Sequence, residues 1–88
     1  MSYKLRLEDL AEKKLAKLKP PVSTQVADML LALRDNPRRP GVIRLVESKQ
    51  RGWRARVGKL RILFLIDDAS QIITVYDIDK RDRVYHKK

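Results

Sequence analysis

The stretch Trp53–Phe64, WRARVGKLRILF, restricts the fold of this chain more than any other segment. Apolar and other residues alternate on both sides of Gly58-Lys59, and such alternation is typical of β-strands with one buried face. Glycine at the first of two turn positions suits a type II′ turn, whose twist matches that of paired strands. The stretch is therefore predicted to form an antiparallel hairpin in which Trp53 lies opposite Phe64.

The two faces of this hairpin differ in chemistry. One face carries Arg54, Arg56 and Arg61, and the predicted register places Arg56 directly opposite Arg61. Like charges directly opposite each other destabilise a sheet by roughly 0.2–1 kcal/mol. We therefore expect an anion to lie between these two guanidinium groups. The other face is apolar and is expected to join the core, with Trp53 as an anchor: Trp53, Ala55, Val57, Leu60, Ile62 and Phe64.

The net charge of the chain also points to a polyanionic partner. The 88 residues carry a formal charge of +10, of which residues 1–35 contribute +2 and residues 36–88 contribute +8. A basic excess concentrated in one part of a chain is typical of nucleic-acid binding. A generic basic surface is the plainer interpretation of the same composition.

Composition excludes several other classes of protein. The chain has no cysteine and one histidine, which excludes a disulfide framework, a cysteine-based zinc site and a histidine-rich metal site. No apolar run approaches the ~20 residues of a membrane span, and the first residues do not resemble a signal peptide. We therefore expect a single domain over residues 1–88, located in the cytoplasm and not bound to a membrane.

The remaining segments predict an α+β fold. Residues 3–7 alternate like a strand, and residues 8–18 have helical spacing that ends before Pro20-Pro21. A second helix is predicted from residue 21 or 23 to about residue 34, antiparallel to the first. Residues 42–46 are either a short strand or an extended link. Residues 72–78, apolar on both faces at first, suggest a central strand covered on both faces. Two helices should therefore cover one face of a small, mostly antiparallel sheet.

Few residues are left that can carry out catalysis. The three glycines are too far apart for a phosphate loop, and a Ser-His-acid or Cys-His arrangement is absent. A magnesium site from Asp77, Asp79 and Asp82 is one possibility, although cations surround these acids. Arginines that bind a phosphate bidentately can instead stabilise the extra charge of a phosphoryl-transfer transition state. Because RNA supplies its own 2′-hydroxyl nucleophile, such chemistry needs no metal and no cofactor.

Taken together, WRARVGKLRILFLIDD and ITVYDIDKRDRVY resemble the RelE/ParE superfamily of toxin–antitoxin toxins, and the RelE branch in particular. The specific resemblance covers about residues 53–85. It implies a RelE-like, microbial RNase-like fold and the toxin of a type II pair. RelE-like toxins are ribosome-dependent endoribonucleases that enter the A site, cut mRNA by 2′-hydroxyl attack and inhibit translation. The resemblance also implies a cognate antitoxin, with the toxin itself monomeric outside that complex.

The resemblance assigns roles to residues of this chain. Arg61 matches an arginine that contacts the scissile phosphate, and Arg81 matches one that assists the transition state or leaving group. Tyr85 matches a C-terminal tyrosine that stacks on a base or accepts the 2′-hydroxyl proton, and a sister branch uses a histidine, for which His86 is the candidate. The proton acceptor is therefore left open between these two. The expected RNA-binding residues are Arg54, Arg56, Lys80 and Arg83.

Two departures from the RelE pattern concern charge. Arginine replaces lysine at positions 54 and 56, and arginine is a poor proton acceptor. Asp79 stands where many relatives have a non-acidic residue, and its charge opposes phosphate binding. Two other functions therefore stay open: a ParE-like inhibitor of DNA gyrase and a non-catalytic basic module that binds nucleic acid.

Overall fold

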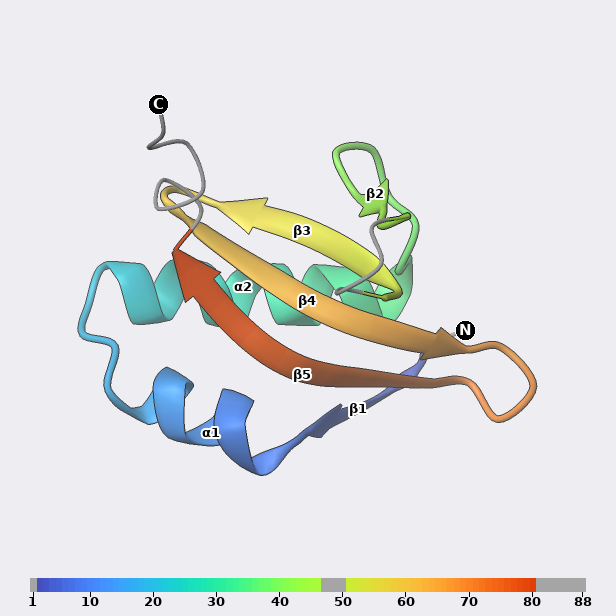
Figure 1. The fold of residues 1–88 in the computed structure, drawn as a ribbon, viewed down its shortest axis with the longest axis horizontal. Helices are drawn as coiled ribbons and strands as arrows, with labels where there is room; N and C mark the ends of the chain where they lie inside the picture. Colours follow the sequence, from blue (N-terminus) through green and yellow to red (C-terminus); the bar gives the residue numbers. More distant parts are fainter. Residues whose placement is uncertain (1, 47–50, 81–88) are drawn as a thin grey trace.

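The computed structural model describes residues 2–46 and 51–80, which form a layer of helices on a β-sheet (Figure 1). Strand β1 (Lys4–Leu7) leads into helix α1 (Asp9–Ala16), and helix α2 (Val22–Asp35) follows. The remaining elements are strands β2 (Ile43–Arg44), β3 (Trp53–Val57), β4 (Leu60–Asp67) and β5 (Ile72–Lys80). This order confirms the predicted α+β class.

Both helices lie where the sequence predicted them, with ends that differ by one or two residues. Helix α1 is shorter than the predicted range of residues 8–18, and α2 extends one residue past its predicted end. Acidic residues in the first turn of α1 and lysines in its last turn complement the helix dipole. Rather than forming one close-packed pair, α1 packs mainly on β5 and α2 packs on β3.

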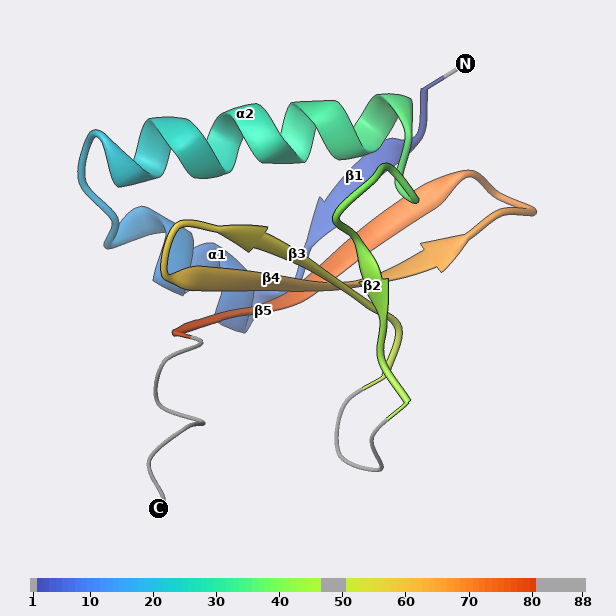
Figure 2. The same cartoon turned by 90° about the horizontal axis from the view of Figure 1, so that it is seen from above.

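The strands form one sheet in the order β1-β5-β4-β3-β2. Strand β1 runs parallel to β5, and the other neighbours are antiparallel, so the sheet is mostly antiparallel as predicted. Helix α2 lies across one face of this sheet (Figure 2). We call the opposite face, which includes Arg54, Arg56 and Arg61, the outer face. Within the described residues, neither helix is long and apolar enough to cross a membrane.

The predicted hairpin is present in its predicted register. Trp53 pairs with Phe64, and Arg56 pairs with Arg61. Gly58 has φ +57° whereas Lys59 has a negative φ, as a type II′ turn requires. The local pattern of alternation and one turn glycine therefore set the geometry of β3 and β4.

Strand β5 differs from its prediction because it contains a β-bulge. Leu63 pairs with Asp77 and Phe64 pairs with Val75, so Tyr76 is an extra residue on β5. A bulge shifts the alternation of side chains by one residue. Val75 and Ile78 are therefore both buried in the core, although their spacing of three would place them on opposite faces of a regular strand. The apolar pattern of β5 therefore reflects this bulge, and β5 lies inside the sheet between β1 and β4.

The core lies between the two helices and the inner face of the sheet. It contains residues of α1 and α2 together with the predicted inner residues of the hairpin: Ala11, Val26, Leu30, Leu33, Ala55, Val57, Ile62, Phe64, Ile73, Val75 and Ile78. Trp53 packs against this cluster at the start of β3. The arginines of the hairpin lie on the opposite side of the sheet, where Arg61 and Leu63 are also buried.

Candidate nucleic-acid interface

One row of three charged residues crosses the outer face from β3 to β5. Arg56 on β3 lies opposite Arg61 on β4, and Arg61 lies opposite Asp79 on β5. Nη2 of Arg61 donates a hydrogen bond to Oδ2 of Asp79 at 3.3 Å. The Asp79 carboxylate is therefore a counter-ion of Arg61 on the side away from Arg56, and the anion expected between the two arginines stays a prediction.

Arg61 is the central residue of this row, and it is buried. Only 8% of its surface is exposed, in contrast to the exposed side chain of Arg56. Among residues 2–46 and 51–80, its Nε has no hydrogen-bond acceptor. A guanidinium held in this way is fixed in position but has donors left to offer.

The structure also describes two further residues that were predicted to bind RNA, Arg54 and Lys80. Arg54 is half-buried on β3 and lines, with Arg56, a hollow of about 390 Å³ at the β3 edge of the sheet. Lys80 is exposed at the end of β5. The structure therefore brings Arg54, Arg56 and Arg61 onto one sheet face and places Lys80 at the end of the strand that carries Asp79.

The other predicted site residues lie outside the described residues. These are the catalytic candidates Arg81 and Tyr85, the alternative proton acceptor His86, and the RNA-binding candidate Arg83. Asp82, the third acid of the suggested magnesium site, lies outside them as well. Of the other two acids, Asp77 forms an ion pair with Lys14 and Asp79 forms one with Arg61.

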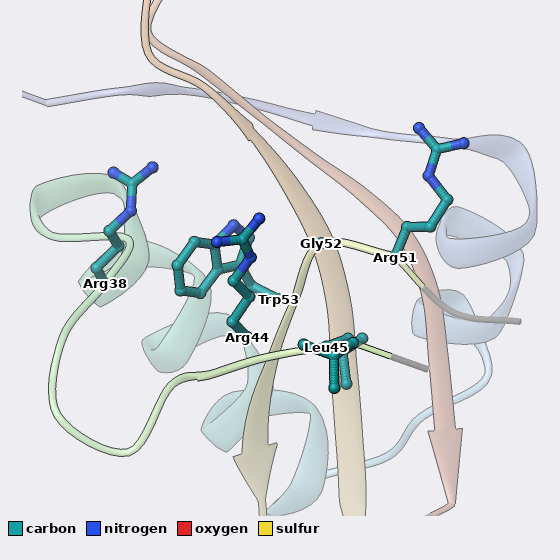
Figure 3. Close-up of a pocket in the computed structure, with 7 residues that line it drawn as sticks. Arg38, Arg44, Leu45, Arg51, Gly52 and Trp53 are labelled. Atoms are coloured by element: carbon teal, nitrogen blue, oxygen red, sulfur yellow. The ribbon is translucent and has the colours of Figure 1, made fainter. Parts of the chain in front are cut away.

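A second basic region surrounds Trp53 and was not predicted. The guanidinium groups of Arg38 and Arg44 lie over the indole ring, at 5.0 Å and 6.0 Å from its centroid. Together with Arg51 they line a hollow of about 490 Å³ (Figure 3). Cations over an indole face are held by the negative charge of its π system. A sequence signal did exist, because the arginine pair in NPRRPG and the neighbouring Arg44 precede a strand that begins with tryptophan.

Arg38 is held over Trp53 by a network that joins three distant segments. Its Nη1 and Nη2 donate to the two carboxylate oxygens of Asp68, at 3.0 Å and 2.8 Å. The Tyr3 hydroxyl donates to Oδ1 of the same carboxylate at 2.7 Å. The hydrogen bonds from Arg38, and then from Tyr3, lower the pKa of Asp68 to about 2. The bond to Asp68 in turn raises the pKa values of Tyr3 and Arg38.

A third region, near the turn of the hairpin, combines an apolar floor with lysines. A hollow of about 540 Å³ has Leu18, Val22, Val57 and Leu60 in its lining, and its lysines are Lys17, Lys19, Lys59 and Lys80. A surface of this kind is complementary to an acidic segment that also carries apolar side chains. It is distinct from the arginine row of the outer face.

Solved structures that are similar to this chain include components of toxin–antitoxin pairs. The chain aligns with a chain of the toxin–antitoxin complex RelBE2 from Mycobacterium tuberculosis with a TM-score of 0.79 and 28% identity, over 92% of this chain and 100% of that one. With a chain of the archaeal RelE–RelB complex from Pyrococcus horikoshii OT3, the TM-score is 0.81 and the identity 22%, over 94% of this chain and 99% of that one. With an Escherichia coli RelE variant in the free state, the TM-score is 0.72 and the identity 21%, over 94% of this chain and 87% of that one. Among proteins of curated function, none matches this sequence significantly.

The sequence itself matches a family of such toxins. Residues 5–85 match the family described as the ParE toxin of the type II toxin–antitoxin system parDE. The chain therefore belongs to the RelE/ParE superfamily and is a toxin of a type II toxin–antitoxin pair, with RelE toxins among its structural neighbours. This confirms the predicted family and fold. The relatives solved as toxin–antitoxin complexes also support an antitoxin as a partner of this chain.

Proposed function

We propose that this chain is a metal-independent endoribonuclease that cuts mRNA in the ribosomal A site and thereby inhibits translation. The observation that carries the proposal is the arginine row of the outer face, in which Arg56 and Arg61 lie directly opposite each other. Membership in the RelE/ParE superfamily and the similarity to RelE toxins support it.

In the proposed reaction, the 2′-hydroxyl of one nucleotide attacks the adjacent phosphate. The bond to the 5′-oxygen of the next nucleotide breaks, which leaves a 2′,3′-cyclic phosphate and a 5′-hydroxyl. Arg61 binds the scissile phosphate, and Arg81 stabilises the charge of the transition state or leaving group. Tyr85 accepts the proton of the 2′-hydroxyl, with His86 as the alternative acceptor.

The RNA backbone on either side of the cut is held by the other basic residues. Arg54 and Arg56 extend the positive face along β3, Lys80 lies at the end of β5, and Arg83 follows it in the sequence. Arginine binds phosphate oxygens through two parallel hydrogen bonds, which fixes orientation as well as position. Positioning and charge stabilisation are the contributions that such a reaction requires from the protein.

The antitoxin is proposed to dock on the lysine-rimmed hollow near the hairpin turn. The apolar floor of this hollow suits a helix with an apolar stripe, and its lysines suit acidic residues beside that stripe. An antitoxin bound there lies next to Lys80, the last described residue of β5.

Mapping the ends of a translated mRNA tests the proposed activity. We expect the wild-type protein to produce 5′ ends within A-site codons in a cell-free translation reaction. Arg56→Ala and Arg61→Ala should reduce the cleavage rate by about 10²-fold or more, because each removes a charge from the phosphate site. The matched control is Arg6→Ala, which removes an exposed arginine from β1 at the other end of the sheet order.

Circular dichroism spectra should first show that each variant is folded, because Arg61 is buried. Absence of cleavage by the wild type, or equal cleavage by all the variants, would refute the proposal. The family match to ParE toxins favours a second candidate function, inhibition of DNA gyrase. A supercoiling assay with the same preparations tests that function, and inhibition by the wild type without mRNA cleavage would establish it instead.

A further inference from the structure

The ion pair between Arg61 and Asp79 leaves the donors of the arginine incompletely used. A carboxylate that binds a guanidinium well accepts two parallel hydrogen bonds, typically at about 2.7–2.9 Å. Asp79 accepts only one from Arg61, at 3.3 Å. Its other oxygen, Oδ1, accepts a hydrogen bond from the backbone N–H of Lys80 at 2.8 Å.

The environment of Arg61 makes this incomplete pairing significant. The side chain of Arg61 is nine-tenths buried, and its Nε has no acceptor in the part of the chain that the structure describes. A buried charge without full hydrogen bonding is unfavourable, so a better acceptor in this place would be bound strongly. A phosphate group offers more acceptor oxygens than the single carboxylate oxygen that Arg61 now contacts.

Asp79 lies in a part of the surface that also carries lysines. This residue lines a hollow of about 310 Å³ together with Lys14, Lys17 and Lys80. Lys14 is paired with Asp77, at 2.8 Å between Nζ and Oδ1. Asp79 thus provides the negative charge closest to Arg61 in a region that is otherwise rich in positive charge.

We propose that Asp79 is an internal competitor of the RNA phosphate, which occupies the Arg61 guanidinium until substrate replaces it. This inference rests on the proposed function, because it assigns Arg61 to phosphate binding. Asp79 does not take part in the chemistry. It positions Arg61 in the free protein and lowers the affinity of the site for anions, so that productive binding requires the exchange of a carboxylate for a phosphate.

The test measures binding of a single-stranded RNA oligonucleotide whose 2′-hydroxyls are methylated, so that cleavage does not contribute. Asp79→Asn keeps the shape of the side chain and an acceptor oxygen but removes the charge. We expect it to bind this RNA about three- to tenfold more tightly than the wild type at low salt, because a repulsive charge near the phosphate is lost. Fluorescence anisotropy measures the affinity.

The matched control is Asp77→Asn, which makes the same change of charge two residues earlier on β5. Asp77 contacts Lys14 instead of Arg61, so this variant should change the affinity less than twofold. In the background Arg61→Gln, the gain from Asp79→Asn should disappear. Unchanged or weaker binding by Asp79→Asn, or an equal gain from Asp77→Asn, would show that Asp79 is only a structural counter-ion.

A measurement on the wild-type protein covers the case in which Asp79→Asn does not fold. Titration with the methylated RNA should shift the ¹⁵N resonance of Arg61 Nε, whereas that of the exposed Arg6 should not move. An unchanged Arg61 resonance at saturation would overturn the proposal. Failure of the proposed function gives a different result. If the wild type binds this RNA but never cleaves mRNA, the proposed catalysis is refuted and the proposal for Asp79 is not.

Discussion

At the scale of single residues, Asp68 connects more segments of the chain than any other residue discussed outside the arginine row. Its carboxylate accepts hydrogen bonds from Arg38 and Tyr3, which come from the loop after α2 and from the segment before β1. Asp68 thereby connects the segment before β1 and the loop after α2 to the turn between β4 and β5. Because Arg38 also lies over Trp53, the same carboxylate helps to shape the basic hollow at the start of β3.

Asp68 should make the protein less stable in acid. Its pKa in the folded protein is about 2, below the usual 3.8, so its contribution to stability is present above about pH 4. That contribution is lost as the pH falls from 4 through 2. We expect Asp68→Asn to be less stable than the wild type at pH 7, with the difference shrinking below pH 4 and approaching zero below pH 2.

Urea unfolding at several pH values measures this difference. Asp28→Asn serves as the control, because Asp28 is exposed on α2 and has no ion pair or hydrogen bond within the described part of the chain. In this control variant, the free energy of unfolding should fall between pH 4 and pH 2 as it does in the wild type. Parallel profiles for the wild type and Asp68→Asn would contradict the assigned role.

The candidate site shows which residue relationships a sequence can reveal. The opposition of Arg56 and Arg61 was predictable, because one short turn fixes the register of β3 and β4. The contact of Arg61 with Asp79 was not, because it depends on where the bulge lies in β5. The same holds for Arg38 and Asp68, which meet only after the whole sheet is assembled.

At the scale of secondary-structure elements, the entry into β3 depends on a close approach of two backbones. Gly52 has φ +88°, and a Cβ atom there would clash with the carbonyl oxygen of Phe64 and lie 2.8 Å from Cδ2 of Leu65. Gly58 in the hairpin turn has φ +57°, but a Cβ atom there would meet open space. A side chain at Gly58 would therefore cause backbone strain alone, whereas a side chain at Gly52 would cause both backbone strain and a steric clash.

Substitution of these glycines by alanine should have unequal effects. We expect Gly58→Ala to lower the free energy of unfolding by about 1–2 kcal/mol, the cost of a left-handed conformation. Gly52→Ala should lower it by about 2–5 kcal/mol, because overpacking adds to that cost. Equilibrium unfolding in urea gives both values. Equal losses would show that the backbones at Gly52 can separate without penalty.

The elements themselves were largely predictable, and their pairing was predictable only in part. Alternation and proline positions marked both helices and the long strands, because these signals are local. The parallel pairing of β1 with β5 joins strands far apart in the sequence, and no turn encodes it. The bulge at Tyr76 also concealed which residues of β5 face the core, because it shifts the alternation of side chains by one residue.

At the scale of the whole molecule, positive charge is spread over several surfaces. The chain carries a net charge of +10, and basic residues line the outer face, the hollow around Trp53 and the hollow near the hairpin turn. Such a field attracts RNA over long distances whichever residues bind it. A specific phosphate site must therefore be distinguished from general attraction by position, not by charge alone.

The salt dependence of RNA binding makes this distinction. Each phosphate contact to single-stranded RNA contributes about −0.7 to the slope of log K against log salt concentration. If Arg54 and Arg56 each contact a phosphate, the variant Arg54→Ala/Arg56→Ala should lower the magnitude of that slope by about 1.4. The variant Lys4→Ala/Arg6→Ala removes the same charge from exposed residues of β1, at the opposite edge of the sheet.

Anisotropy titrations with the methylated RNA at several salt concentrations give both slopes. The β1 variant should keep a slope close to that of the wild type, because its residues act on the RNA only at a distance, where salt screens them. Strands β5 and β4 separate β1 from β3, so the two variants differ in position along the sheet and not in charge. Equal reductions would mean that the whole basic surface attracts RNA without a defined path. A reduction confined to the β3 variant would place the RNA backbone along β3, beside the row that contains Arg61.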